Sequence, residues 1–597
     1  MSSLGAEHLP TSWPCSHAIC SRPGEESGRP GGAEIKLRIV SWQYGGLWVR
    51  IKRMTVPASG TPSNPATGSA ATPADASSET PAEASSETPS ETQVYCIHGA
   101  DPEVQAYALA KYSRSSLSLK QSLAELNEQK AEKFLSTFYF QYGHRSIADL
   151  AHVAMAIEKL SLLAATLVVD ETRWDGQERS TRYQDFRRSG HYVPEFSDPA
   201  DRRLYEETIA FLFAEYRKFS ELNFQYLVAR TAKPREMSQE AYERTLRARA
   251  FDISRYLLPL AANTSLGQIV NARTLETQVS RLLGSPYEEV RRLGERMKEA
   301  ARAAAWDVNA GKRLALVEAI AEKDATLGER ARAELLHETR VSPTLMKYAE
   351  PSAYELASRQ ELRQVEAELM SGQSIAAAPE VDLLDEEPLE VELATTLLYE
   401  HSRHPYRQLR EAVVSLSRAR REEIIDLGMC HRGRHDELLR PFCAGQKFRF
   451  DILMDIGAYR DLHRHRRCVQ IHQEYCFAHG FEVPREIRDA GYAESYAAAM
   501  ERAGEAGRRL ADALAARGEP GQAAQYLLPL AYRKRTLFKM DFAEVVYISE
   551  LRTGVGGHWS YRNVAYQMYE RVAERYPALA KYFRVTDIHE PVDLLQR

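Results

Sequence analysis

Several features that would each point to a large class of proteins are missing from this sequence. No apolar run reaches the roughly 18 residues that a membrane-spanning helix needs, and no apolar signal segment precedes the first charges. The seven cysteines form no regular framework, which favours reduced thiols in a cytoplasmic protein. The net charge is only −5, from 78 basic and 83 acidic residues, so bulk charge does not favour a nucleic-acid partner.

Common catalytic and nucleotide-binding motifs are also missing. The chain has no P-loop, no G-x-S-x-G, and no G-x-G-x-x-G after a strand. The stretch "CHRGRH" (430–435) with Cys443 is a weak zinc candidate, because no paired C-x-x-C accompanies it. We therefore expect no metal centre.

Residues 55–92 contain no aromatic residue, no lysine and no arginine, and Val56 is their only large aliphatic side chain. Such a segment cannot bury enough apolar surface to offset its chain entropy. Residues 1–53 show no periodicity either, and Met54 is an alternative start to Met1. We predict that residues 1–92 are disordered.

From residue 93 onward the sequence repeats itself. A strand signal followed by an acidic-Pro helix start occurs at 93–115 and again at 380–403. "RYLLPLA" (255–261) recurs as "QYLLPLA" (525–531), and "HYVPEF" (191–196) has a counterpart in "FEVPREI" (481–487). Three matches in one order predict two copies of one α/β domain, each with a mixed sheet and long helices. The expected boundaries are 93–310 and 380–597, joined by a helical linker at 311–379.

Four polar stretches carry the candidate chemistry. "DLHRHRR" (461–467) concentrates positive charge, which persists only where the side chains diverge or share an anion. "QERSTRYQDFRR" (177–188) alternates an acceptor, a hydroxyl and a guanidinium, which in an extended segment face one side and suit a nucleotide. "QYGHRSIADLAH" (141–152) and "IVNARTLETQVSRLL" (269–283) place polar residues at helix starts. Taken singly, each is also compatible with an exposed turn, a solvated strand or a capped helix.

Taken in order, these stretches resemble the flavin-dependent thymidylate synthases. The order is Gly-His-x-Ser, an apolar stretch, E-x-S-x-R-Y, Tyr-Val-Pro, R-x-x-L-P-L and V-N-A-R, and it covers about 93–300 and 380–580. The signature of this family, R-H-R followed by Ser and Arg-Tyr, is divided between the copies. The first copy keeps Glu178, Ser180, Arg182 and Tyr183, and the second keeps Arg464, His465 and Arg466.

The two copies depart from the family pattern at complementary positions. The first copy has Asp170, Glu171 and Thr172 in place of R-H-R, and the second has "CVQIHQEYCF" in place of the Ser and Arg-Tyr part. The second copy also carries an insertion around 418–447. At the positions of Arg255, Asn271 and Arg273 in the first copy, the second copy has Gln525, Asp541 and Ala543. The helix arginine of the family matches Arg552 in the second copy, whereas in the first copy Arg281 lies one residue short of that position. The glutamine that precedes R-H-R in the family is Asp461 here.

The resemblance implies reductive methylation of dUMP to dTMP, in which methylenetetrahydrofolate gives the methylene and FAD, reduced by NADPH, supplies the hydride. Members of this family look like tetramers with shared active sites. We then expect one composite site per chain, an empty reciprocal site, and a homodimer that forms a pseudo-tetramer. The resemblance assigns Arg464 and Arg552 to catalysis, Glu178, Ser180, Arg182, Arg255, Arg464 and Arg552 to dUMP, and His144, Ser146, Asp149, Asn271, Arg273, Arg464, His465 and Arg466 to FAD.

Two alternatives stay open at this point. One is a non-catalytic flavin- or nucleotide-binding relative with a role in regulation or assembly. The other is a different flavin-dependent methylation on the same scaffold. In every case we expect small-molecule ligands, with neither nucleic acid nor a membrane as partner.

Overall fold

The computed structural model describes residues 95, 99–111, 118–124, 145–347, 349–433, 436–591 and 593–595. The segment predicted to be disordered, most of the first predicted strand and His144 lie outside these ranges. Residues Val94–Arg597 form one compact unit. In the described ranges, no helix is both long and apolar enough to cross a membrane.

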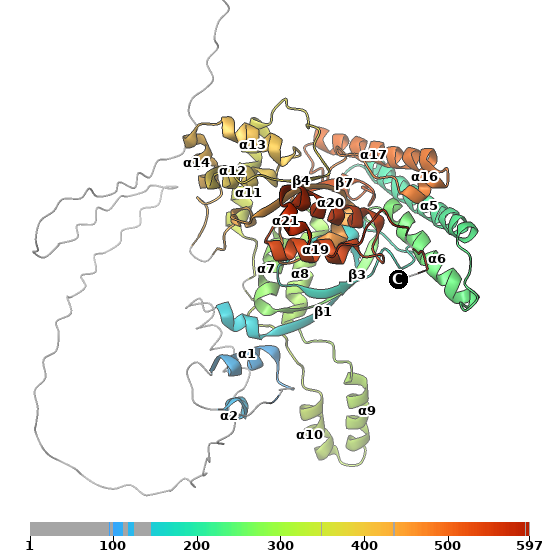
Figure 1. The fold of residues 1–597 in the computed structure, drawn as a ribbon. Coiled ribbons are helices and arrows are strands. Elements are labelled where there is room, and N and C mark those ends of the chain that lie inside the picture. Colours follow the sequence, from blue (N-terminus) through green and yellow to red (C-terminus); the bar gives the residue numbers. More distant parts are fainter. Residues whose placement is uncertain are drawn as a thin grey trace, which may run out of the picture. The chain divides into compact units, whose positions relative to one another are not determined.

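The first repeat is built on a three-stranded sheet in the order β1-β3-β2, labelled in Figure 1. Its strands are β1 (His152–Ser161), β2 (Asp175–Glu178) and β3 (Asn263–Asn271). The helices are α1 (Pro102–Lys111), α2 (Leu119–Ala124), the 3-10 helix η2 (Arg145–Leu150), α4 (Leu162–Val168), α5 (Pro199–Arg230), α6 (Gln239–Ser254), the 3-10 helix η3 (Arg255–Leu257), α7 (Ala272–Leu283) and α8 (Glu288–Arg302).

The second repeat is built on a four-stranded sheet in the order β4-β5-β7-β6. Its strands are β4 (Val381–Leu383), β5 (Phe448–Asp455), β6 (Val469–His472) and β7 (Arg533–Met540). The helices are α12 (Leu389–Tyr399), α13 (Tyr406–Ser415), α14 (Arg418–Leu427), the 3-10 helix η4 (Arg440–Phe442), α15 (Ile456–Leu462), α16 (Arg485–Asp489), α17 (Ala493–Ala516), α18 (Gln522–Gln525), α19 (Phe542–Thr553), α20 (Trp559–Arg575) and α21 (Pro577–Ala580).

Strands β5, β7 and β6 take the places that β1, β3 and β2 take in the first repeat, which confirms the α/β class and the tandem duplication. The prediction of a mixed sheet is wrong for the described strands, because all their pairings are antiparallel. The physical reason is the same in both repeats. In each repeat the last strand lies between two strands and runs antiparallel to both, and in the second repeat β4 also runs antiparallel to β5.

Between the repeats the chain is helical. It forms α9 (Ala310–Ala321), α10 (Ala325–Leu335) and α11 (Ala353–Leu369). Helices α9 and α10 pack on each other, whereas α11 packs on α12 and α14 of the second repeat. The insertion predicted at 418–447 contains α14 and η4, so α11 and the insertion lie together.

The helix starts show how the sequence sets these elements. Ser161 accepts a hydrogen bond from the backbone N–H of Ala164 at 2.9 Å and begins α4, and Asp455 begins α15 in the same way. Asn271 begins α7 as predicted. The helix predicted to open within 141–152 is only the short η2, because β1 already begins at His152.

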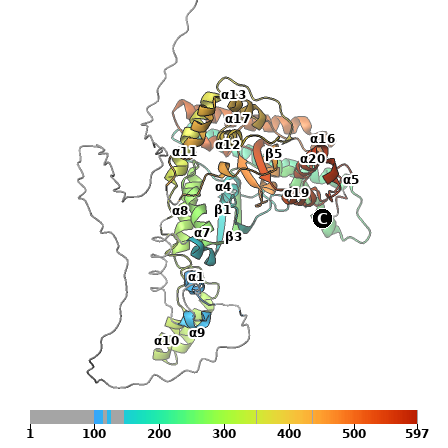
Figure 2. The same ribbon diagram turned by 60° about the vertical axis from the view of Figure 1, so that its left-hand side comes forward.

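The two repeats face each other across an internal pseudo-two-fold axis at the L-P-L segments. The N–H of Leu260 donates to the carbonyl of Leu528 at 2.9 Å, and the N–H of Leu530 donates to the carbonyl of Leu258 at 3.0 Å. Helices α5 and α17 pack side by side in Figures 1 and 2. Such reciprocal contacts are those of an isologous dimer, and both repeats contribute to one hydrophobic core.

Candidate active site

The basic stretch 461–467 begins in the last turn of α15, which ends at Leu462, and continues beyond the helix. His463 and His465 are buried, whereas the arginines between and after them reach the surface. Like charges this close together repel, and the structure separates them by giving each a different acidic partner. Arg464 lies 3.5 Å from Glu178, Arg466 lies 2.9 Å from Asp175, and Arg467 lies 2.8 Å from Asp541.

Glu178, the last residue of β2, joins the two repeats. Its carboxylate is buried and accepts hydrogen bonds from Arg460 of α15 and from Arg464, which lies two residues beyond the end of that helix. The turn after α15 brings Arg464 to the same carboxylate that Arg460 contacts from the last turn of the helix. The two divided halves of the predicted signature therefore meet at this carboxylate.

Arg182 also crosses between the repeats. Its Nε and Nη2 donate to the two carboxylate oxygens of Asp252 at 3.0 Å each. Its Nη1 donates to the hydroxyl of Tyr561 at 2.9 Å, and its Nη2 donates to the carbonyl of Gly556 at 2.9 Å. Tyr561 and Gly556 belong to the second repeat, so this guanidinium is buried between the two.

The segment from Glu178 to Arg182 is not extended throughout, contrary to the prediction. The strand ends at Glu178, and the chain then turns. The hydroxyl of Ser180 accepts a hydrogen bond from the N–H of Arg182 at 3.2 Å, a bond typical of serine in turns. Turn chemistry therefore overrides the alternating pattern on which the prediction rested.

Arg255 and Asp461 form a third contact across the repeats. Both Nη atoms of Arg255 donate to Oδ2 of Asp461 at 3.0 Å. Burial on its own would raise the pKa of Asp461, but attraction by nearby arginines outweighs it and holds the pKa below its usual value. The arginines responsible are Arg255, Arg182, Arg552 and Arg464, which therefore converge on one carboxylate.

His465 is hydrogen-bonded directly to Arg552. The Nε of Arg552 donates to Nε2 of His465 at 2.7 Å, and Nδ1 of the same ring lies 3.4 Å from Glu544. Burial lowers the pKa of His465, which suits a neutral ring that accepts at Nε2 and keeps its proton at Nδ1. This imidazole orients Arg552, whose guanidinium lies 5.6 Å from the ring centroid of Tyr561.

The flavin residues predicted in the first repeat form a separate group. Arg273 lies 3.5 Å from Asp149 and 3.1 Å from Glu437 of the insertion. Asn271 uses its side chain to cap α7, and Ser146 is exposed on η2. Oδ1 of Asp149 is buried, accepts no hydrogen bond among the described atoms, and lies 3.6 Å from Nη1 of Arg173.

This group lies at the same end of the sheet as the second arginine of R-H-R. Asp175, the partner of Arg466, pairs with Ile269 on β3, two residues before Asn271. The guanidinium of Arg466 also lies over the ring of Trp174, 5.2 Å from its centroid. An elongated anionic ligand could therefore contact Arg464, Arg466 and the first-repeat group together. The donor set fits a dinucleotide such as FAD.

At the reciprocal position the acidic side chains form ion pairs with arginines of the chain itself. Asp170 and Glu171, which replace R-H-R in the first repeat, contact Arg440 and Arg281 respectively, each at 2.7 Å. Arg440 belongs to the insertion. A cavity of about 1100 Å³ adjoins these pairs and is lined by both repeats, α11 and the insertion. The insertion thus docks on the first repeat through Arg440 and Glu437.

Sequence reasoning missed three residues that the structure places among the arginines. They are Arg460, Asp252 and Tyr561. Arg460 had a signal, because it is a further arginine only four positions before Arg464 in the sequence. Asp252 and Tyr561 had none, because their contacts with Arg182 depend on how distant segments pack.

The comparisons with known proteins agree with the duplication. The family model for the thymidylate synthase complementing protein, Thy1, matches twice, at residues 96–305 and 383–578, together more than half of the 597-residue chain. A UPF0159 protein of Chlamydia muridarum is 29% identical over 82% of this chain and 91% of its own length. A UPF0159 protein of Thermoplasma acidophilum is 26% identical over 80% of this chain and 94% of its own length.

Similar solved structures are distant. A thymidylate synthase X of Helicobacter pylori, solved with FAD and dUMP, is 14% identical, with a TM-score of 0.23 over 35% of this chain and 93% of that one. A UMP/dUMP methylase of Streptomyces cacaoi, solved with 5-Br dUMP, is 17% identical, with a TM-score of 0.23 over 33% of this chain and 84% of that one.

Proposed function

Because the chain belongs to the family of thymidylate synthase complementing proteins, we propose that it is a flavin-dependent enzyme that methylates dUMP to dTMP. The reaction takes its methylene from methylenetetrahydrofolate and its reducing equivalents from NADPH. FAD supplies the hydride when bound. Each chain carries one composite active site, formed by the first-repeat strand–turn segment and the second-repeat helices α15 and α19.

The observation that carries this proposal is the meeting of the divided signature. Glu178 of the first repeat contacts Arg464 of the second, and Arg182 and Arg255 of the first repeat reach Tyr561 and Asp461 of the second. Random decay of two copies would not preserve complementary halves that meet in space. Arginines gathered in this way hold and polarise an anionic nucleotide.

We propose the following roles, which position and exposure support. Arg464 is the more exposed arginine and reaches ligand phosphate or a uracil oxygen, and Arg552, oriented by His465, stabilises charge that develops on the base. Glu178, Ser180, Arg182 and Arg255 bind dUMP. FAD is held by Arg464 and Arg466 with Ser146, Asp149, Asn271 and Arg273, while His465 acts through Arg552. The role of His144 stays a prediction.

One observation favours a second candidate function. Asp461 stands where the family has glutamine, and Arg255 is already neutralised by it. A protein that binds flavin or nucleotide without turnover tolerates such self-pairing better than an enzyme does. The two candidates differ in a simple measurement, because only the enzyme converts dUMP to dTMP when NADPH and methylenetetrahydrofolate are added to the flavin-loaded protein.

The test compares two neighbouring arginines. Arg464→Ala should lower FAD or dUMP affinity at least tenfold, since a charge-assisted contact to a phosphate contributes about 1.5–3 kcal/mol. Arg467→Ala is the matched control: it removes the same charge from the same stretch, and Arg467 pairs instead with Asp541 at the surface. Flavin absorption and dUMP titration are measured for both. Equal effects of the two variants would refute the proposed site.

Two further expectations belong to the same proposal. A homodimer would bring four repeats together as a pseudo-tetramer, and light scattering should then give twice the 67.5 kDa chain mass. A cytoplasmic location fits the small-molecule substrates, and fractionation of cells tests it.

A further inference from the structure

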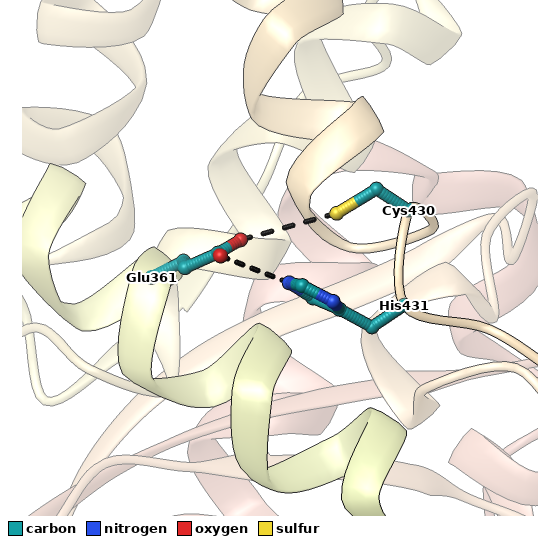
Figure 3. Close-up of side chains that lie close together, drawn as sticks. All are labelled: Glu361, Cys430 and His431. Carbon is teal, nitrogen blue, oxygen red and sulfur yellow. Dashed lines mark hydrogen bonds and ion pairs between the residues drawn. The ribbon is translucent and has the colours of Figure 1, made fainter. Parts of the chain in front are cut away.

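The stretch "CHRGRH" meets an acidic side chain that lies far from it in the sequence. Helix α14 ends at Leu427, and Cys430 and His431 follow in the next turn. Glu361 lies on α11, in the segment between the repeats. Its Oε1 is 2.9 Å from Nε2 of His431, and its Oε2 is 3.9 Å from Sγ of Cys430. Figure 3 shows the three side chains pointing toward one another.

The turn that carries Cys430 and His431 is held in place on α11. The hydroxyl of Tyr354, at the start of α11, donates to the carbonyl of Gly428 at 2.6 Å. Gly428 itself is tightly enclosed: a Cβ there would lie 2.9 Å from side-chain atoms of Leu397 and Phe442. The N–H of Cys430 donates to the carbonyl of Asp426 at 2.7 Å, which continues the end of α14 into the turn.

The residues after the pair close the same turn. The N–H of Arg432 donates to the carbonyl of Met429 at 3.0 Å, and its Nε donates to the carbonyl of Asp436 at 2.9 Å. The N–H of Gly433 donates to a carboxylate oxygen of Asp436 at 2.8 Å. The backbone on both sides of Cys430 and His431 is therefore fixed before any ligand arrives.

We propose that Glu361, Cys430 and His431 form a zinc site that ties the insertion to α11. Their three ligand atoms lie within 4.8 Å of one another. A thiolate, an imidazole and a carboxylate are together the donor set that Zn²⁺ takes in proteins, with bonds of about 2.0–2.3 Å. Atoms 2.9 and 3.9 Å apart are close to the edges of such a tetrahedron, so only small side-chain movements are needed.

Among the described residues, these three side chains are the available ligands, so a fourth coordination position remains. The three protein ligands leave room for a water molecule, as in zinc sites that keep an exchangeable ligand. His431 also lines the cavity of about 1100 Å³ at the reciprocal position, so a solute in that cavity can reach the metal. Binding replaces the thiol proton of Cys430 and is therefore favoured by rising pH. The flavin chemistry of the composite site does not use this metal.

Cobalt substitution tests the site on the full-length protein. The chain is stripped with a chelator, dialysed and titrated with Co²⁺, and difference spectra against the metal-free protein cancel any flavin absorption. We expect one Co²⁺ per chain, a thiolate-to-cobalt charge-transfer band in the near ultraviolet, and loss of the band when Zn²⁺ is added. Added zinc should also raise the melting temperature.

Two cysteines of the same insertion give the matched comparison. Cys430→Ser should abolish the charge-transfer band, whereas Cys443→Ser, which changes another exposed cysteine, should leave it unchanged. Glu361→Gln and His431→Ala should weaken Co²⁺ binding by more than the roughly 10–100-fold that loss of an outer hydrogen bond costs. A wild-type protein without the band, or a band that persists in a folded Cys430→Ser protein, overturns the proposal. If Cys430→Ser does not fold, unchanged affinity in Glu361→Gln does the same.

Discussion

At the residue scale, the centre of the candidate site is held by charges that belong to different repeats. Arg255 is almost fully buried, and Asp461 faces it from the second repeat at 3.0 Å. Removing one partner of a buried ion pair leaves the other charge without compensation, which costs far more than removing both. The contact therefore constrains how the repeats pack, independently of any ligand.

Arg255→Ala should accordingly lower the free energy of unfolding by about 3–5 kcal/mol. The double variant Arg255→Ala with Asp461→Asn should recover part of this loss, because it no longer buries a carboxylate that has lost its hydrogen-bonded arginine. Urea denaturation of the two single variants and the double variant measures the coupling. Additive losses would contradict a direct interaction between the two side chains.

Lys534 gives a prediction for pH. It is buried at the reciprocal position, with its ammonium 4.0 Å from the ring centroid of Tyr475 and 4.5 Å from that of Tyr459. Burial lowers its pKa to about 7, although Asp170, Cys476 and Glu474 attract the charged form. An unfolded lysine keeps its proton up to about pH 10.4. Between these values the unfolded state binds more protons, so stability rises with pH.

Lys534→Met removes this titration. Relative to the variant, the wild-type protein should gain up to about 1.4 kcal/mol of stability for each pH unit between pH 7 and 10. Thermal unfolding of both proteins across this range measures the difference. Parallel pH profiles would show that Lys534 keeps its ordinary pKa in the folded state.

The candidate site could be predicted at this scale only where residues sit in an ordered motif. Arg182, Arg255, Arg464 and Arg552 were identified in this way, and the structure brings them together around Asp461. What they bind stays a prediction. The partners Asp252 and Tyr561 could not be predicted, because an isolated Asp or Tyr in a helix gives no signal of a contact made by tertiary packing.

At the scale of elements, helix-capping residues predicted the local backbone structure better than the alternation of polar side chains did. The start of α7 at Asn271 was predicted, because its amide satisfies a free N–H of the first turn whatever the tertiary context. The alternation in 178–182 failed, because the hydroxyl of Ser180 closes a turn there. The antiparallel sheets could not be predicted, because strand order depends on contacts between β3 or β7 and strands distant in sequence.

The insertion around 418–447 contacts the first repeat, and the contribution of this contact to stability can be tested. Arg440 contacts Asp170 of the first repeat at 2.7 Å, and the carboxylate is largely buried. Arg440→Ala should lower the free energy of unfolding by about 1–3 kcal/mol, less than for a fully buried pair because water reaches the arginine. Chemical denaturation measures the loss.

The control is an arginine on the same insertion. Arg420 pairs with Glu423 at 2.7 Å on the surface of α14, and Arg420→Ala should change stability by no more than about 0.5 kcal/mol, as for other exposed pairs. Equal losses in the two variants would show that Arg440 does not anchor the insertion.

At the scale of the whole molecule, the repeats are arranged as two subunits of a dimer. The duplication could be predicted, because the L-P-L segments and their neighbours recur in one order. Their direct pairing could not, although the reciprocal hydrogen bonds between Leu258, Leu260, Leu528 and Leu530 now define the pseudo-axis. A symmetric pair of intact subunits has two equivalent sites, whereas the divided signature leaves only one of the two positions with its arginines.

This asymmetry sets the expected binding stoichiometry. At one position Glu178, Arg182 and Arg255 meet Arg464 and Arg552, while at the other Asp170 and Glu171 are neutralised by Arg440 and Arg281. We expect a nucleotide phosphate to be attracted to the first position, because the second has acidic residues in place of R-H-R. Isothermal titration of dUMP into the flavin-loaded protein should therefore give about one site per chain, with one FAD per chain by absorbance. Two dUMP sites would rule out a single composite site, and none in a correctly folded protein would favour the non-catalytic relative.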